Sequence, residues 1–101
     1  ANEDEILPVT ATTLNGNYPN PFNPETSISY AIKDAGNVSL EIYNLKGQRV
    51  RSLVHGTQTT GHYRIVFDGK DDHGQPLSSG VYFYRLTTGT YTSTRKMMLM
   101  E

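Results

Sequence analysis

The sequence contains no cysteine and no tryptophan among its 101 residues. Without cysteine it has neither a disulfide framework nor a thiol nucleophile. No apolar run approaches the roughly 20 residues that a membrane-spanning helix needs. Neither sign of charge dominates, because the formal net charge is -1 and acidic and basic residues are mixed along the chain. There is thus no basic face of the kind that nucleic-acid binders show, and a length of this order suits one modest core.

The first residues differ in composition from the rest. Ala1 leads directly into an acidic stretch at residues 2–5, with no secretory signal before it. We expect residues 1–13 to be a linker or tail from an upstream domain of a longer parent protein. Residues 14–101 are expected to form one domain.

The remaining sequence predicts an all-β fold. Thr, Tyr, Val and Ile are abundant, and turn formers recur at intervals of roughly ten residues. Alternating apolar and polar residues predict strands, with a short one added at the start: residues 10–14, 26–32, 38–43, 48–54, 61–68, 80–87 and 91–100. About seven short antiparallel strands indicate an Ig-like antiparallel β-sandwich, and a small open barrel is the structural alternative.

Details of the alternation give sharper expectations. Residues 15–17 are predicted to be a turn and residues 55–60 a polar loop. A break in the alternation of 48–54 indicates a β-bulge. Residues 80–87 have apolar side chains on both faces, which is typical of a central strand.

Three of the five prolines lie within six residues, in the segment Tyr18-Pro19-Asn20-Pro21-Phe22-Asn23-Pro24, called the strap below. Proline fixes its own φ and disfavours helix in the residue before it, so the strap is expected to be extended and semi-rigid. A plain linker would favour Gly and Ser over aromatic rings. We therefore expect Tyr18 and Phe22 to cover one end of the core.

Candidate chemical sites are sparse. Asp68, Asp71 and Asp72 are dense enough to suggest calcium, but their spacing does not fit an EF-hand loop. A turn in which the aspartates accept backbone N–H bonds is the favoured interpretation. The three histidines, His55, His62 and His73, show no metal-ligand spacing. No nucleophile elbow or phosphate-cradling loop is present, so the sequence predicts neither an enzyme nor a cofactor.

Two surfaces suggest binding. Tyr43, with whichever of the pairs Val81/Phe83 or Tyr82/Tyr84 lies outside the core, would form a sugar-stacking or protein-binding face. The last segment, Arg95-Lys96-Met97-Met98-Leu99-Met100-Glu101, starts with two cations and is otherwise largely apolar. The segment is interpreted as the last strand, with one Met face buried, and this interpretation leaves room for a role in binding. A terminal strand with an open edge is a handle for strand addition by a partner.

Several blocks, in order, resemble the type A C-terminal sorting domain of the type IX (Por) secretion system. The first is the strap followed by Thr26-Ser27-Ile28-Ser29-Tyr30. The others are the runs at residues 38–50, 67–71 and 79–86, and finally Thr94-Arg95-Lys96-Met97. The resemblance covers roughly residues 14–101, and Phe67 stands where the family often has Trp. The same blocks are similar to the Ig-like domain of flagellar hook-capping proteins.

The resemblance implies a seven-stranded Ig-like domain at the C-terminus of a protein that is secreted, or held at the cell surface, after passing through the periplasm of a Gram-negative bacterium. Its implied partners are secretion-machinery proteins at the outer membrane and the upstream domain of the same polypeptide. We expect residues 95–101 to make the secretion contact and the strap to mark the family, in a chain that acts as a monomer. The alternatives are a carbohydrate-binding module of an extracellular polysaccharide-degrading enzyme and a purely structural Ig-like spacer.

Overall fold

A computed structural model describes residues 7–101, in which seven strands and no helix are found. The strands are β1 (Thr13–Tyr18), β2 (Thr26–Ile32), β3 (Gly36–Tyr43), β4 (Arg49–Gln58), β5 (Gly61–Phe67), β6 (Gly80–Thr87) and β7 (Thr92–Leu99). No helix capable of spanning a membrane is therefore present in this range.

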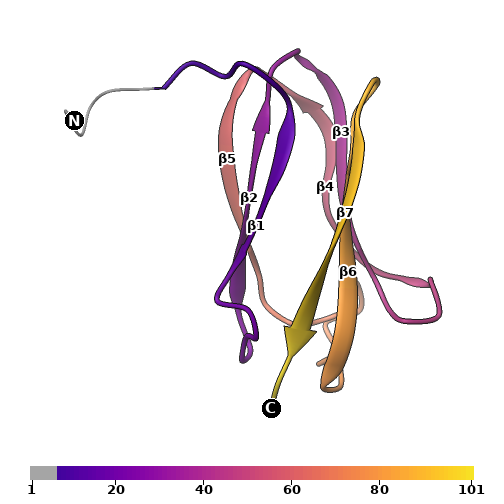
Figure 1. Cartoon of the computed structure of the whole chain (residues 1–101). Helices are drawn as coiled ribbons and strands as arrows, with labels where there is room; N and C mark the ends of the chain where they lie inside the picture. The colour runs from indigo at the N-terminus through magenta and orange to yellow at the C-terminus, as the bar shows by residue number, and fades with distance from the viewer. Residues whose placement is uncertain (1–6) are drawn as a thin grey trace.

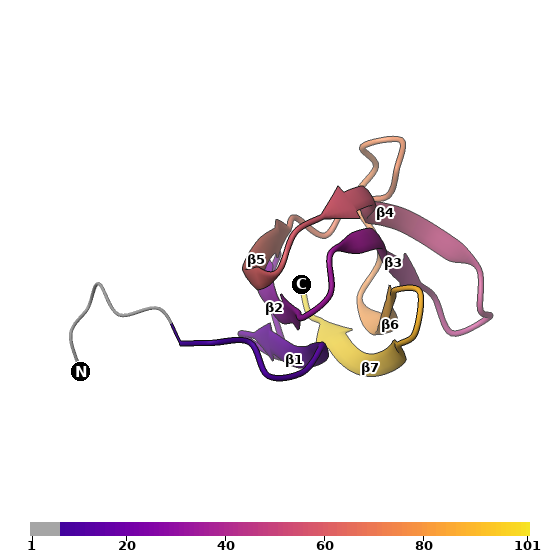
Figure 2. The same cartoon turned by 90° about the horizontal axis from the view of Figure 1, so that it is seen from above.

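The strands form two sheets that pack face to face (Figure 1). The smaller sheet has the order β1-β2-β5 and the larger the order β4-β3-β6-β7, and every strand pair is antiparallel. Viewed along the strands, the two layers enclose a single core (Figure 2). The predicted Ig-like β-sandwich is thus confirmed, and β6 is the central strand that its composition indicated.

The core is built by alternation along the strands. In β3 every second side chain from Val38 on is buried, and β2 alternates in the same way except that Ala31 is buried as well. In β6 Tyr82, Tyr84 and Leu86 point inward while Val81 and Phe83 point outward. Burying each apolar side chain is worth about 1.5–3 kcal/mol before conformational entropy is counted. The core residues are Leu14, Phe22, Ile28, Tyr30, Ile32, Val38, Leu40, Ile42, Phe67, Tyr82, Tyr84, Leu86, Met97 and Leu99.

Two sequence predictions were wrong in detail. β1 begins three residues later than expected and runs through the predicted turn at 15–17, because a bulge between Leu14 and Gly16 lets the chain stay paired with β2. β4 extends to Gln58 through the predicted loop at 55–60, since its polar residues still pair with β3. The register of that pair shifts twice, so the predicted bulge in this strand is confirmed.

The expectation of an extended strap is wrong, because the chain bends at residues 19–21 and 23–24. The three X–Pro peptide bonds of the strap are cis. Phe22 is 2% exposed and lies 6.0 Å from the Phe67 ring, so it closes one end of the core as expected. Tyr18 is 83% exposed, and its predicted packing on the core is wrong. The difference arises because Tyr18 ends β1 outside the sandwich, whereas Phe22 lies between the two sheets.

The long connection between β5 and β6 packs closely against the strap at a glycine. Gly69 is buried and has a φ of +76°, in the left-handed region. A Cβ at this position would lie 2.7 Å from the carbonyl oxygen of Pro24. Only glycine satisfies both the backbone conformation and this close approach.

Replacing Gly69 by alanine is expected to lower the free energy of unfolding by about 2–4 kcal/mol, from left-handed strain and the clash together. Urea denaturation measures the loss. Gly74→Ala is the matched control, because Gly74 has a φ of +81° with open space around it. We expect the control to lose only about 1–2 kcal/mol, and equal losses at both sites would contradict the role of the Pro24 contact.

Candidate functional surface beside the terminal strand

The segment predicted to make the secretion contact divides into buried and exposed residues. Met97 and Leu99 are 1% and 3% exposed and belong to the core. Lys96, Met98 and Met100 alternate with them and are exposed, Met98 at 41% and Met100 at 50%. The predicted burial of one Met face is therefore confirmed. Only the alternate residues remain available to a partner.

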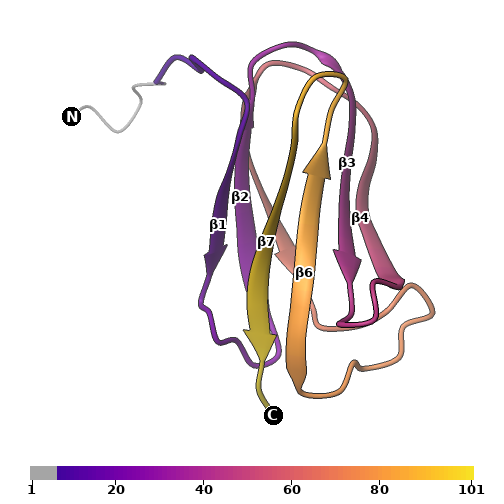
Figure 3. The same cartoon turned by 45° about the vertical axis from the view of Figure 1, so that its right-hand side comes forward.

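Those exposed residues continue onto the outer face of the larger sheet. Met98 pairs with Val81 and Lys96 with Phe83, and Phe83 pairs in turn with Tyr43 of β3. We call these five residues, Tyr43, Val81, Phe83, Lys96 and Met98, the terminal patch. Figure 3 shows the three strands that carry it, with β6 lying between β3 and β7. The two surfaces that the sequence suggested separately are one surface in the structure.

Charged groups hold Tyr43 in the patch. Its hydroxyl donates to Glu41 Oε1 at 2.7 Å, and Arg49 forms an ion pair with the same carboxylate at 3.1 Å. The Tyr43 hydrogen bond, aided by Arg49, holds the pKa of Glu41 below its ordinary value despite partial burial. The Arg85 guanidinium lies over the Tyr43 ring, 4.8 Å from its centroid. One face of this ring is thus already covered by a cation.

A shallow hollow of about 280 Å³ adjoins the patch. It is lined by the aromatic side chains of Tyr43 and Phe83 together with Leu45 and Arg85. Leu45 is 70% exposed in the β3–β4 turn and extends the apolar surface beyond the sheet. The hollow is suited to an apolar or aromatic side chain of a partner. A carboxylate beside that side chain would also be favoured, because Arg49 and Arg85 outnumber the single carboxylate of Glu41.

The open edge expected for β7 is occupied by the strap. The Phe22 N–H donates to the Met98 carbonyl, and the Met100 N–H donates to the Phe22 carbonyl, both at 2.9 Å. The Asn20 side chain accepts from the Met98 N–H at 3.0 Å. A partner strand could pair with this half of β7 only by displacing the strap. The expectation of an exposed terminal edge is therefore wrong, although the predicted role of residues 95–101 in a contact stays a prediction.

Arg95 lies on the opposite side of β7 from the patch. Its Nε donates to the Leu14 carbonyl of β1 at 2.9 Å and so joins the two sheets. It lines a polar hollow of about 480 Å³ between β1 and β7 with the Asn15, Asn17 and Asn20 side chains. Asn17 and Asn20 are committed to hydrogen bonds that position the strap and Tyr84. The structure therefore places Arg95 as a link between the sheets, and Lys96 borders the same hollow from the other side of β7.

The three aspartates of the β5–β6 connection accept protein hydrogen bonds. Asp71 Oδ1 accepts from the backbone of His73 and of Gln75, each at 2.9 Å, which is the turn pattern expected of the favoured interpretation. Asp68 and Asp72 accept from Arg51 and from the Ser52 backbone respectively. Within residues 7–101, no group of three His, Cys, Asp or Glu side chains lies close enough to hold a metal ion.

Arg51 organises this loop, and sequence reasoning missed it. Its Nη1 donates to Asp68 Oδ1 and to the Lys70 carbonyl, both at 2.8 Å, while its guanidinium lies 5.9 Å from the Phe67 ring centroid. The only sequence signal was an arginine in a strand that precedes an aspartate-rich connection. Such a signal cannot say which of the three aspartates will be reached.

Acid is expected to destabilise the protein through this loop. Burial opposes ionisation of Asp68, but the bonds from Arg51 and the Lys70 N–H outweigh it and lower the pKa. The Gln75 and His73 N–H groups lower the pKa of Asp71. A lowered folded pKa gives stability that is present above the unfolded value of about 4 and is lost as pH falls through the folded value. The free energy of unfolding should therefore decrease from about pH 4 downward.

Urea denaturation at a series of pH values tests this expectation. The double variant Asp68→Asn/Asp71→Asn should flatten the acid limb of the curve. Asp34→Asn is the control, because Asp34 is exposed and its side chain makes no hydrogen bond within the described residues. An acid limb that is unchanged in the double variant would contradict the assignment.

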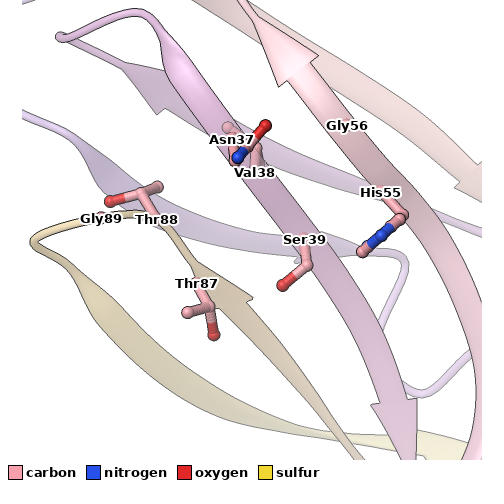
Figure 4. A pocket seen from close by; sticks show the side chains of 8 residues that line it. All are labelled: Asn37, Val38, Ser39, His55, Gly56, Thr87, Thr88 and Gly89. Carbon is pink, nitrogen blue, oxygen red and sulfur yellow. The ribbon is translucent and has the colours of Figure 1, made fainter.

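A hollow of about 330 Å³ lies at the other end of the larger sheet's outer face. Figure 4 shows Ser39, His55 and Thr87 along neighbouring strands, with Asn37 above them. Ser39 pairs with His55 across β3 and β4, yet within residues 7–101 no side-chain hydrogen bond joins them. His62 and His73 are exposed elsewhere, on β5 and in the β5–β6 connection. This small Ig-like domain shows nothing that indicates catalysis in the residues described.

Comparison with known proteins gives one family. The family model described as the FlgD Ig-like domain matches residues 22–93, more than half of the chain. No curated protein sequence matches the chain. Among solved structures, FlgD from P. aeruginosa is 25% identical with a TM-score of 0.57, over 73% of this chain and 58% of that one.

Two further structures come from Porphyromonas gingivalis. Dimeric latent PorU is 22% identical with a TM-score of 0.68, over 83% of this chain and 9% of that one. PorZ, an essential bacterial surface component of the type IX secretion system, is 22% identical with a TM-score of 0.56, over 84% of this chain and 11% of that one. The chain thus spans less than two thirds of each solved relative, and the PorU and PorZ likenesses show a shared fold.

Proposed function

The chain belongs to the FlgD Ig-like domain family, and on that premise we propose that it is a non-catalytic sorting and surface-anchoring domain of a larger secreted bacterial protein. In this proposal the type IX secretion machinery at the outer membrane recognises the domain by protein–protein contact. The parent protein would reach the cell surface or the medium through the periplasm. Structural similarity to PorU and PorZ, two Por proteins, supports the proposal at the level of fold.

The observation that carries the proposal is the alternation along the terminal strand. Met97 and Leu99 anchor the strand in the core, so Lys96 and Met98 are held rigidly on the surface beside Phe83. An apolar surface next to a lysine, presented by a fixed strand, is suited to binding a protein partner with little loss of backbone conformational entropy. The secretion contact is therefore proposed at the terminal patch, which includes Lys96 and Met98, together with the neighbouring Met100.

Export of a reporter tests this function. The full chain fused behind a reporter should be exported by a host with a working type IX system. The double variant Lys96→Glu/Met98→Ser should reduce export about ten-fold, the size expected when contact residues at the centre of an interface are lost. Its matched control is Leu7→Ser/Lys33→Glu, because both residues are exposed and lie where β2 ends and β5 begins, away from the terminal patch.

The results of the export experiment distinguish the sorting function from its alternatives. Equal export of the two double variants would remove the terminal patch from the proposal, and no export of the unchanged fusion would remove the sorting function itself. The latter outcome would favour a structural spacer, which the likeness to FlgD supports. A carbohydrate-binding module is less well supported, because Arg85 covers one face of the Tyr43 ring.

A further inference from the structure

The sandwich has four sheet edges, and three of them are protected. The strap bonds to β7 through Phe22. β1 is bulged at Gly16, and its Leu14 carbonyl accepts from Arg95. β4 is bulged twice, and the Asp72 N–H of the β5–β6 connection donates to its Val50 carbonyl. Bulges and covering segments are the means by which proteins prevent unwanted strand pairing.

The fourth edge, β5, has none of these features. It pairs with β2 over its whole length, from Gly61 to Phe67, without a register shift and without proline. Within residues 7–101, no backbone hydrogen bond reaches β5 from any segment other than β2. Figure 2 shows β5 at the border of the smaller sheet, away from the side where β1 and β7 meet. An unprotected edge of seven residues is a template for an added strand.

The two faces of this edge differ in character. Tyr63 and Ile65 point toward the core but are only partly buried, so an added strand would bury them further. His62, Arg64 and Val66 point outward, and Val66 is 54% exposed. Arg64 is opposite Ser29 of β2 and makes no ion pair within residues 7–101. Arg64 therefore supplies the single formal charge on the outer face of β5, and it is positive.

We propose that the free edge of β5 binds an extended segment of a partner protein by antiparallel strand addition, with acidic side chains opposite Arg64 on the outer face. The backbone of β5 supplies the hydrogen bonds, and the alternation of its side chains sets which partner residues face inward. A second copy of this chain is a poorer occupant. It would bring the Arg64 side chains of both copies onto one face, where like charges across strands destabilise the pair. This surface is separate from the terminal patch.

The test uses two fusion proteins, each with one extra strand attached in front of Ala1 by a flexible Gly/Ser linker. The linker raises the effective concentration of the extra strand at the β5 edge. Each extra strand copies the β2 sequence Thr26–Ile32, with glutamate in one fusion and lysine in the other at the two outward serine positions. The attachment is close enough, because the Leu7 carbonyl lies 3.1 Å from His62 Nε2 at the start of β5. Amide hydrogen exchange of β5 is measured for each fusion and for the unfused chain, and sedimentation gives the oligomeric state.

Exchange at alternate β5 amides should be about three- to ten-fold slower in the glutamate fusion than in the lysine fusion, as expected for one or two cross-strand charge pairs. Arg64→Glu should reverse that order. Equal exchange in the two fusions and the unfused chain would overturn the proposal, as would an order that Arg64→Glu leaves unchanged. Dimerisation of the unfused chain with protection of β5 would assign the edge to a second copy and overturn it too.

Discussion

Replacing Phe22 by alanine is expected to lower the free energy of unfolding by about 3–5 kcal/mol, the usual cost of deleting a buried phenylalanine ring. Phe22 is 2% exposed, packs on Phe67 and closes the core between the sheets. Because small domains are stabilised by only about 5–15 kcal/mol, this loss would leave the domain close to unfolding. Urea denaturation followed by circular dichroism measures it.

Two variants sharpen this prediction. Tyr18→Ala removes another strap aromatic, but Tyr18 is 83% exposed, so its effect should stay within about 0.5 kcal/mol. Phe22→Leu keeps most of the apolar volume and should recover more than half of the loss. If Phe22→Ala were as mild as Tyr18→Ala, the strap would not be part of the core. The assigned function of the strap as a cover for β7 would then fail as well.

Deleting residues 94–101 is expected to unfold the domain at 25 °C. The deletion removes Met97 and Leu99 from the core, and each such loss costs about 2–5 kcal/mol. It also leaves the backbone N–H and carbonyl of Phe22 without partners, at a further cost of about 1–3 kcal/mol for each buried group. The sum is comparable to the whole stability of a small domain. Loss of dispersed amide resonances in a proton–nitrogen NMR spectrum is the measurement.

The surface variant Lys96→Glu/Met98→Ser provides the comparison, because both side chains are exposed and the fold should persist. A cooperative, near-native unfolding transition in the deleted chain would show that β7 contributes little to the core. If instead it unfolds as expected, loss of export on deletion could not by itself identify a secretion contact. This is why export is tested with surface substitutions.

The sequence was sufficient to predict the architecture because alternation is local. The runs containing Ile28, Leu40 and Tyr84 each have period two, and a period of two specifies a strand with one buried face. Loop chemistry was predicted where the cause was also local. Asp71 accepts the nearby N–H groups that its position in a turn favours.

The predictions that failed concern contacts between segments far apart in the chain. Nothing within residues 18–24 indicates that Phe22 will pair with Leu99, which lies more than seventy positions later. The edge of β7 therefore appeared open. The bulge at Gly16 was mistaken for a turn for a related reason, since Asn and Gly favour both and only the partner strand decides between them.

The candidate site was predicted in pieces. Alternation within 94–101 correctly indicated a buried and an exposed Met face, but it could not place Lys96 beside Phe83 or Arg95 beside Leu14. Those neighbours follow from strand order, which is a property of the whole fold. The sequence therefore identified the residue types of the terminal patch but not its membership.

The direction of the chain through the sandwich has a consequence for any multidomain parent. Residues 7–12 enter at one end, and β7 runs the full length of the sandwich to leave at the other (Figure 1). Eight residues of strand span roughly 25 Å. A neighbouring domain attached ahead of Leu7 would be separated from Met98 and Met100 by about the length of this strand. Under the proposed function, a bulky upstream domain would then leave Met98 and Met100 accessible to the secretion machinery.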